Sequence, residues 1–70
     1  MKVSQLIHAM HRDDEIVIDD FYLPIDTMTV YIGAVRGIKK DNPVNKMHVM
    51  SIHAMNDKIY VLASGERSKR

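Results

Sequence analysis

The chain has 70 residues, of which 46% are apolar, a formal net charge of +1 and no cysteine. This length predicts one domain, and the lack of cysteine excludes disulfides, thiolate metal sites and thiol redox chemistry. The ordinary apolar content excludes global disorder. Because a domain of this size buries only about 60% of its unfolded surface, we expect an oligomer or a partner to contribute to its stability.

The first element that the sequence predicts is an amphipathic helix of about ten residues. Val3, Leu6, Ile7 and Met10 recur at i, i+3, i+4 and i+7, which places them on one helix face. Ser4 is a suitable N-cap. A helix this short is unstable alone, so its apolar face must pack against a sheet.

The rest of the chain is rich in β-branched and aromatic residues, which favour strands. A bulge is predicted at Gly33. Pro24 permits an edge strand or a loop over residues 21–25, but not a central strand. The predicted strands cover residues 15–19, 27–37, 46–54 and 58–63.

Asn56-Asp57 predicts a tight hairpin turn between the last two strands, because both residues tolerate a positive φ. The register then follows, and every second pair is apolar on both sides. The predicted pairs are Met55–Lys58, Ala54–Ile59, His53–Tyr60, Ile52–Val61, Ser51–Leu62 and Met50–Ala63.

We therefore predict an α+β domain over residues 1–64, with a flexible basic tail over residues 65–70. One N-terminal amphipathic helix packs on a three- or four-stranded antiparallel sheet, arranged as a meander or a small barrel. The side chains expected beneath the helix are Met50, Ile52, Ala54, Ile59, Val61 and Ala63. Those expected on the opposite face are Met47, Val49, Ser51, His53, Tyr60 and Leu62, together with Tyr31 and Val35.

This opposite face is too apolar for open solvent. It is explained equally well by closure into a barrel, pairing with a second copy, or docking on another macromolecule. The candidate partner-binding residues are Tyr31, Val35, Val49, His53, Tyr60 and Leu62, with an acidic patch of Asp13, Asp14, Asp19 and Asp20 that would meet a basic groove on a host protein.

Neither the histidines nor the carboxylates predict a chemical site. His8 and His11 lie three apart on the helix but have no evident third ligand, and His48 and His53 point to opposite faces of one strand. No nucleophile or phosphate-binding loop accompanies the acidic cluster. We expect no metal, no cofactor and no enzymatic activity.

Basic residues supply an alternative, because neutralising phosphates is the main requirement of nucleic-acid binding. The candidates are Arg36, Lys39, Lys40 and Lys46 and the tail residues Arg67, Lys69 and Arg70. The order of one helix and bent strands is also similar to that of Sm-like RNA-binding proteins. The glycine and asparagine signatures of the RNA-contacting loops of that family are absent here.

The opening Val3-Ser4-Gln5-Leu6-Ile7, followed by an acidic turn and Glu15-Ile16-Val17-Ile18, resembles small bacteriophage-encoded accessory proteins. This resemblance implies a host-takeover or anti-defence protein that binds a host component. We expect a non-enzymatic protein that inhibits or modulates a host protein or protein complex, and that forms a homo-oligomer, such as a dimer. The alternatives are a nucleic-acid binder and a homo-oligomeric sponge for a small ligand. The chain begins without the apolar segment of a secretory signal and has no apolar run long enough for a bilayer, so we expect it in the host cytoplasm, away from the membrane.

Overall fold

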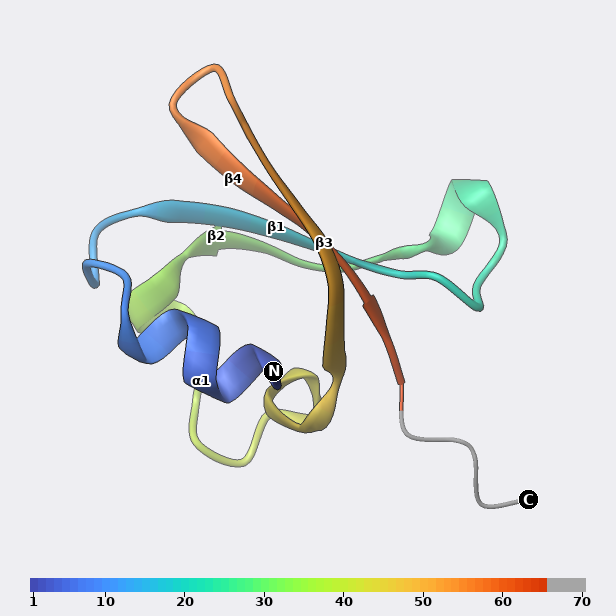
Figure 1. Cartoon of the computed structure of the whole chain (residues 1–70), viewed down its shortest axis with the longest axis horizontal. Coiled ribbons are helices and arrows are strands. Elements are labelled where there is room, and N and C mark those ends of the chain that lie inside the picture. Colours follow the sequence, from blue (N-terminus) through green and yellow to red (C-terminus); the bar gives the residue numbers. More distant parts are fainter. Residues whose placement is uncertain (66–70) are drawn as a thin grey trace.

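The computed structural model of this chain describes residues 1–65 and contains one short helix and four strands (Figure 1). Three 3₁₀ helices lie in the connections between them. No helix among the described residues is long and apolar enough to cross a membrane. In chain order the elements are α1 (Val3–His8), β1 (Glu15–Asp20), η1 (Ile25–Thr27), β2 (Thr29–Ala34), η2 (Val35–Gly37), η3 (Pro43–Lys46), β3 (His48–Met55) and β4 (Lys58–Ser64).

The four strands form one mixed sheet in the order β2-β1-β4-β3. β1–β2 and β3–β4 are antiparallel hairpins, and they join through a parallel β1–β4 pair. The α+β class is confirmed, whereas the prediction of an all-antiparallel sheet is wrong at this joint, and the sheet is open and not a barrel. The two central strands carry the uninterrupted apolar runs Ile16–Ile18 and Ile59–Ala63, as expected for strands covered by neighbours on both sides. The edge strand β2 carries the run Val30–Ile32, which is as long as the first of these.

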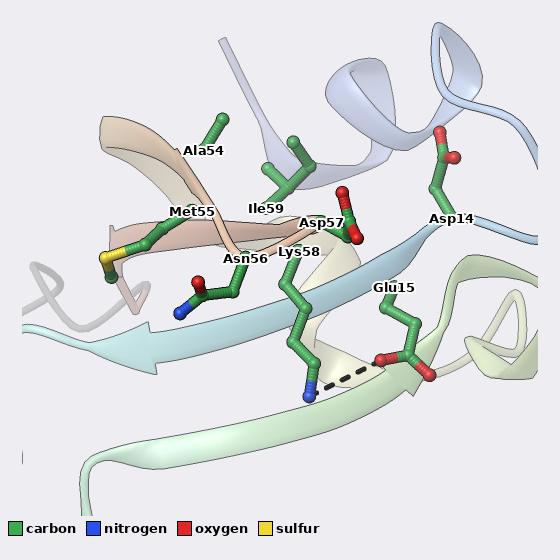
Figure 2. Close-up of a pocket in the computed structure, with 8 residues that line it drawn as sticks. All are labelled: Asp14, Glu15, Ala54, Met55, Asn56, Asp57, Lys58 and Ile59. Carbon is green, nitrogen blue, oxygen red and sulfur yellow. Dashed lines mark ion pairs between the residues drawn. The ribbon is translucent and has the colours of Figure 1, made fainter.

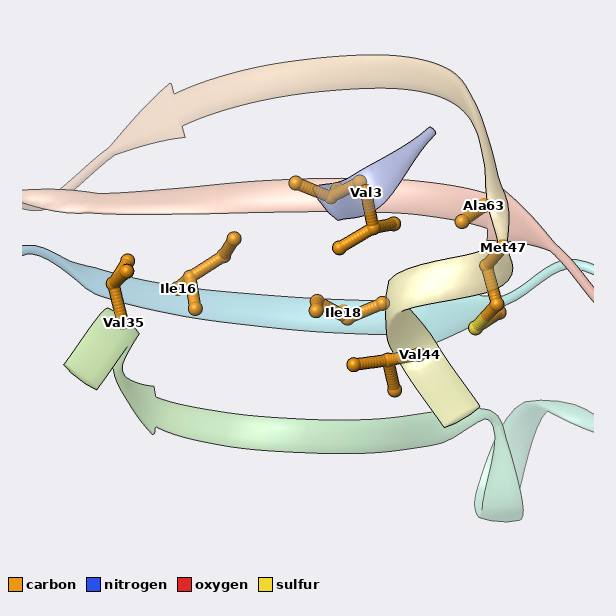
Figure 3. Close-up of a cluster of buried hydrophobic side chains, with 8 residues drawn as sticks. Val3, Ile16, Ile18, Val35, Val44, Met47 and Ala63 are labelled. Atoms are coloured by element: carbon orange, nitrogen blue, oxygen red, sulfur yellow. The ribbon is translucent and has the colours of Figure 1, made fainter. Parts of the chain in front are cut away.

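The hydrophobic core lies between the sheet and α1, with the β2–β3 connection beside the helix (Figure 3). Ile16, Ile18 and Val61 project from the central strands and are essentially inaccessible to solvent. Val3 from α1 and Val44 from η3 cover them. Each such side chain contributes about 1.5–3 kcal/mol through burial, so this single layer holds the helix, the crossover and the sheet together.

Helix α1 has the predicted apolar face but is shorter than predicted. It spans six residues, and its N-cap is Lys2 and not Ser4. The Lys2 backbone N–H donates to Gln5 Oε1 at 2.7 Å, which satisfies one donor at the helix start. The helix ends before Met10 because the chain turns at 11–14, where Asp14 N–H donates to the His11 carbonyl oxygen at 3.1 Å.

The strand predicted over 27–37 is confirmed only at its centre. β2 covers 29–34, and residues on either side of it form η1 and η2. The bulge lies at Val30, which is skipped between the pairs Ile18–Tyr31 and Asp19–Thr29, and not at Gly33. Residues 21–28 form a loop, which settles the alternative that Pro24 left open.

The β3–β4 hairpin is confirmed. Asn56 and Asp57 have φ of 52° and 64°, as the predicted turn requires. The predicted register holds from Met55–Lys58 to Ser51–Leu62. It fails at the last pair, because a bulge between Val49 and Ser51 sets Val49, and not Met50, opposite Ala63.

Candidate functional site

The sheet face opposite α1, here called the open face, is covered by no helix among the described residues. One row of paired residues crosses all four strands on it, from His53 through Tyr60 and Val17 to Ile32. Val17 is only 7% exposed because it lies between two larger neighbours, whereas Ile32 at the edge is 65% exposed. The structure therefore brings His53 and Tyr60 together on this face as predicted, and Leu62 follows two residues along β4.

Four residues predicted for the open face lie on the α1 side instead, and one of them, Met47, is buried in the core. Val35 is buried in the core, and Tyr31 and Val49 are half-buried and pack against it. The Met50 bulge causes the error at Val49, since one extra residue reverses the face of every residue beyond it. The error at Tyr31 has another cause: Tyr31 pairs with the core residue Ile18, so β2 presents to the core the face that was predicted to lie opposite. Val35 leaves the strand altogether and begins η2.

The acidic residues do not form one patch. Asp13 and Asp14 precede β1, whereas Asp19 and Asp20 end it, so the length of the strand separates the two pairs. Each of these carboxylates also has a local contact. Asp13 pairs with Arg36, Asp14 Oδ2 accepts from His11 N–H at 3.0 Å, Asp19 Oδ1 accepts from Thr29 Oγ1 at 2.7 Å, and Asp20 Oδ1 accepts from Tyr22 N–H at 3.0 Å.

Strand β3 forms an exposed edge of the sheet. Met1 and Lys2 cover only its beginning, through the Lys2–His48 bridge and a 2.9 Å bond from Val3 N–H to the Met47 carbonyl oxygen. Every residue from Met50 to Met55 is exposed, including three predicted for the core, Met50, Ile52 and Ala54. They are uncovered because α1 is too short to reach this end of the hairpin. We call Met50–Met55 the β3 edge.

An open hollow of about 370 Å³ lies beneath the hairpin turn (Figure 2). Glu15 and Lys58 meet there in an ion pair of 3.5 Å, and Asp14 and Asp57 line it as well. The pair is half-exposed, with 54% of the Glu15 side chain and 38% of the Lys58 side chain accessible. Exposed pairs of this kind contribute little to stability, and no histidine, serine or threonine lines the hollow for proton transfer or nucleophilic attack.

A second groove, of about 530 Å³, lies between α1 and the 35–45 segment. Ile7, Val35 and Ile38 form an apolar floor, and the cations Arg12, Arg36 and Lys40 line it with His8. We call it the basic groove. It contains two of the predicted nucleic-acid residues, Arg36 and Lys40, and adds Arg12, which was missed although the Glu15–Ala34 pairing sets residues 12 and 36 at the same end of the hairpin.

The other predicted basic residues lie elsewhere. Lys39 adjoins the basic groove without lining it, and Lys46 lines a separate hollow beside Asp20 and Gly65. Arg67, Lys69 and Arg70 lie outside the described residues. Among residues 1–65, no phenylalanine, tyrosine or tryptophan lines the basic groove, so it lacks the large aromatic rings on which successive bases stack in single-strand binding sites.

The sequence prediction allowed a loop over residues 21–25, between β1 and β2, but missed that its apolar side chains are exposed. Phe21 is 50% and Ile25 84% exposed, although neither is charged or polar. Five consecutive apolar residues around Pro24, which cannot enter a central strand, were the available signal. We call residues 21–26 the apolar loop.

Within residues 1–65, no three histidine, aspartate or glutamate side chains gather to hold a metal ion. Comparison with known proteins finds no matching family model, no matching curated protein and no matching solved structure. The surfaces described above are therefore the basis for assigning a function.

Proposed function

We propose that this chain is a non-enzymatic protein-binding module that pairs its β3 edge with an extended segment of a partner protein. The observation that carries the proposal is the character of this edge. Six successive exposed residues contain no Lys, Arg, Asp, Glu or Pro. Natural proteins usually protect such an edge with charge or proline, because its unpaired backbone groups invite another strand.

The side chains of the β3 edge suit strand addition. Ile52 and Ala54 pair with core-facing residues of β4, whereas His53 pairs with Tyr60 on the open face. An added strand would therefore meet the apolar side chains of Ile52 and Ala54 on the α1 side of the sheet and His53 on the open face. Backbone hydrogen bonds supply affinity in this mode of recognition, and alternate side chains supply specificity.

The partner that we propose is a bacterial host protein, which the chain would inhibit or modulate. The resemblance of residues 1–20 to bacteriophage accessory proteins supports this choice. The non-enzymatic part of the proposal is supported by the hollow beneath the hairpin turn, where Glu15 and Lys58 are half-exposed and paired with each other and, within residues 1–65, no serine, threonine or histidine lines the wall.

The test is capture of partners from a bacterial lysate by three immobilised chains: the natural chain, Ile52→Lys and Ile32→Lys. Ile52 is 45% exposed on β3, and Ile32 is 65% exposed on the opposite edge strand, so both lysines remain in solvent. Circular dichroism and thermal unfolding first establish that both variants fold. Quantitative mass spectrometry then measures each captured protein.

We expect one protein to be enriched by the natural chain and by Ile32→Lys, and to fall at least about tenfold with Ile52→Lys, because a lysine on the edge obstructs strand pairing. Equal capture by all three chains would refute the β3 edge as the binding surface. Enrichment of no protein over an empty resin would refute the protein-binding function itself.

A further inference from the structure

The apolar loop is an ordered projection with its apolar side chains directed into solvent. Phe21 N–H donates to the Ala63 carbonyl oxygen at 2.8 Å, Leu23 N–H to that of Asp20 at 3.1 Å, and Thr27 N–H to that of Pro24 at 2.9 Å. The rings of Phe21 and Tyr22 also meet edge to face at 5.3 Å. A binding segment held in this way loses little conformational entropy when it docks.

The tip of the apolar loop combines an apolar and an acidic side chain. Ile25 is the most exposed of the large apolar residues, at 84%, and Asp26 follows it in the first turn of η1. The chemistry of this tip is complementary to the basic groove, where an apolar floor is lined by cations.

Hydrogen bonds fix the backbone that carries the cations of the basic groove, so these cations are positioned to bind a carboxylate. Arg36 N–H donates to the Arg12 carbonyl oxygen at 2.9 Å, which fixes the two residues side by side. Asn45 Nδ2 donates to the carbonyl oxygens of Lys39 and Lys40 at 2.8 and 3.1 Å, which fixes the turn that carries Lys40. Within residues 1–65, Arg36 has one acidic partner, Asp13, whose side chain is 87% exposed, so an incoming carboxylate can replace it at little cost.

The two features cannot meet within one chain. The basic groove lies where β1 begins, beside Asp14, and the apolar loop lies where β1 ends, after Asp20 (Figure 1). Six residues of extended strand separate them by about 20 Å. A contact between them therefore requires two molecules.

We propose that the apolar loop of one copy inserts into the basic groove of a second copy, with Ile25 on the floor formed by Ile7 and Ile38 and Asp26 against Arg12 and Arg36. Both charge and polarity match at this contact. Each copy then offers one loop and one groove, so the contact is head-to-tail, and it generates rings or open chains. This arrangement differs from a two-fold dimer, and it uses neither the β3 edge nor the open face.

The test is a complementation experiment by sedimentation velocity across a wide range of chain concentrations, at low and at high salt. The loop variant is Ile25→Glu, and the groove variant is Arg12→Glu combined with Lys40→Glu. All three positions are exposed, so the fold is retained. Ile52→Lys on the β3 edge serves as the matched control.

We expect the natural chain and Ile52→Lys to form species larger than a dimer, and both variants to associate at least about tenfold more weakly at low salt. A 1:1 mixture of the two variants should give a heterodimer and nothing larger, because only one intact loop and one intact groove remain. High salt should weaken the natural association, since screening reduces the contribution of Asp26.

Three results would overturn the proposal: a natural chain that stays monomeric, variants that associate as the natural chain does, or a mixture that forms no heterodimer. A fluorescein-labelled thymidine oligonucleotide is added in a parallel titration. If the groove variant loses oligonucleotide binding while its self-association is unchanged, the basic groove is a nucleic-acid site, and the head-to-tail contact is refuted. The β3 edge takes no part in this contact. Refutation of the head-to-tail contact would therefore not refute the proposed function, which is tested separately by capture from a lysate.

Discussion

The backbone N–H of Arg36 donates to the carbonyl oxygen of Arg12 at 2.9 Å, beyond the last residue pair of the β1–β2 hairpin. The neighbouring bond, from Val35 N–H to the Asp14 carbonyl oxygen at 2.9 Å, continues the same ladder. Residues that are 24 positions apart in the sequence are thus fixed side by side by the hairpin. Asp13 follows Arg12 directly in the sequence, and its carboxylate pairs with Arg36.

Replacement of Asp13 should affect the free energy of unfolding and the self-association of the chain differently. Asp13→Asn removes an exposed ion pair, so we expect the free energy of unfolding in urea to change by less than about 1 kcal/mol. The variant also frees Arg36 for the carboxylate of a second copy, so self-association should tighten at low salt. Glu15→Gln is the control, because it breaks the other surface ion pair, with Lys58, outside the basic groove. Weaker association of Asp13→Asn, or equal tightening by Glu15→Gln, would contradict the expectation.

The core predicts a sharp contrast between two isoleucines that receive the same substitution. Ile18 on β1 is 0% exposed and Ile32 on β2 is 65% exposed. Ile18→Val should lower the free energy of unfolding by about 0.5–1.5 kcal/mol, because it leaves a methyl-sized space in a closed layer. Ile32→Val should change it by less than about 0.5 kcal/mol. Urea denaturation of both variants measures the difference, and equal losses would show that Ile32 is covered in solution.

Local pattern was sufficient for the elements that depend on local chemistry. The helix face followed from Val3, Leu6 and Ile7, and the hairpin followed from Asn56-Asp57 with its alternating apolar pairs. In both cases the spacing of a few neighbouring residues determines the geometry. The length of the helix was overestimated because the apolar spacing continues to Met10. The backbone hydrogen bonds end α1 at His8, and the apolar spacing does not determine where they end.

The pairing of β1 with β4 could not be derived in the same way, because it joins residues more than forty positions apart. Glu15 pairs with Lys58 and Ile16 with Ile59, in parallel. Consecutive apolar residues did not identify the two central strands, because the edge strand β2 carries the run Val30–Ile32, as long as the run in β1. The bulge at Met50 left no local signal, and it moved Val49 to the core side. The face that Tyr31 presents is likewise set by its pairing with Ile18 and not by the alternation within β2. The basic groove and the apolar loop depend on this topology, which is why neither was predicted as a unit.

The hairpin turn predicts a stabilising substitution. Asp57 has a φ of 64°, in the left-handed region, where glycine has no steric penalty. We expect Asp57→Gly to raise the free energy of unfolding by about 0.5–1 kcal/mol. Asp57→Ala keeps a Cβ without the local hydrogen bonding of aspartate, so it should lower stability instead. Thermal unfolding of the two variants tests this, and a loss of stability in both would show that the Asp57 carboxylate matters more than the backbone conformation.

Glycine is also the favoured residue at position 33, inside β2. Gly33 has a φ of 145°, and a Cβ there would meet Tyr31 Oη at 3.3 Å. That hydroxyl donates to the Ala34 carbonyl oxygen at 2.7 Å, so the Tyr31 ring cannot withdraw without breaking this bond. We therefore expect Gly33→Ala to lower the free energy of unfolding by about 1–3 kcal/mol.

Gly65→Ala is the control for this prediction, because a Cβ at Gly65 would make only an ordinary contact with Asp20 Oδ2 at 3.4 Å, and its φ is not in the left-handed region. Alanine there restricts the unfolded chain, so stability should stay the same or rise by up to about 1 kcal/mol. Denaturation in urea compares the two variants. If Gly33→Ala is tolerated as well as Gly65→Ala, the Tyr31 side chain does not lie over β2 in solution, and the core-side position of Tyr31 must be abandoned in favour of the open face.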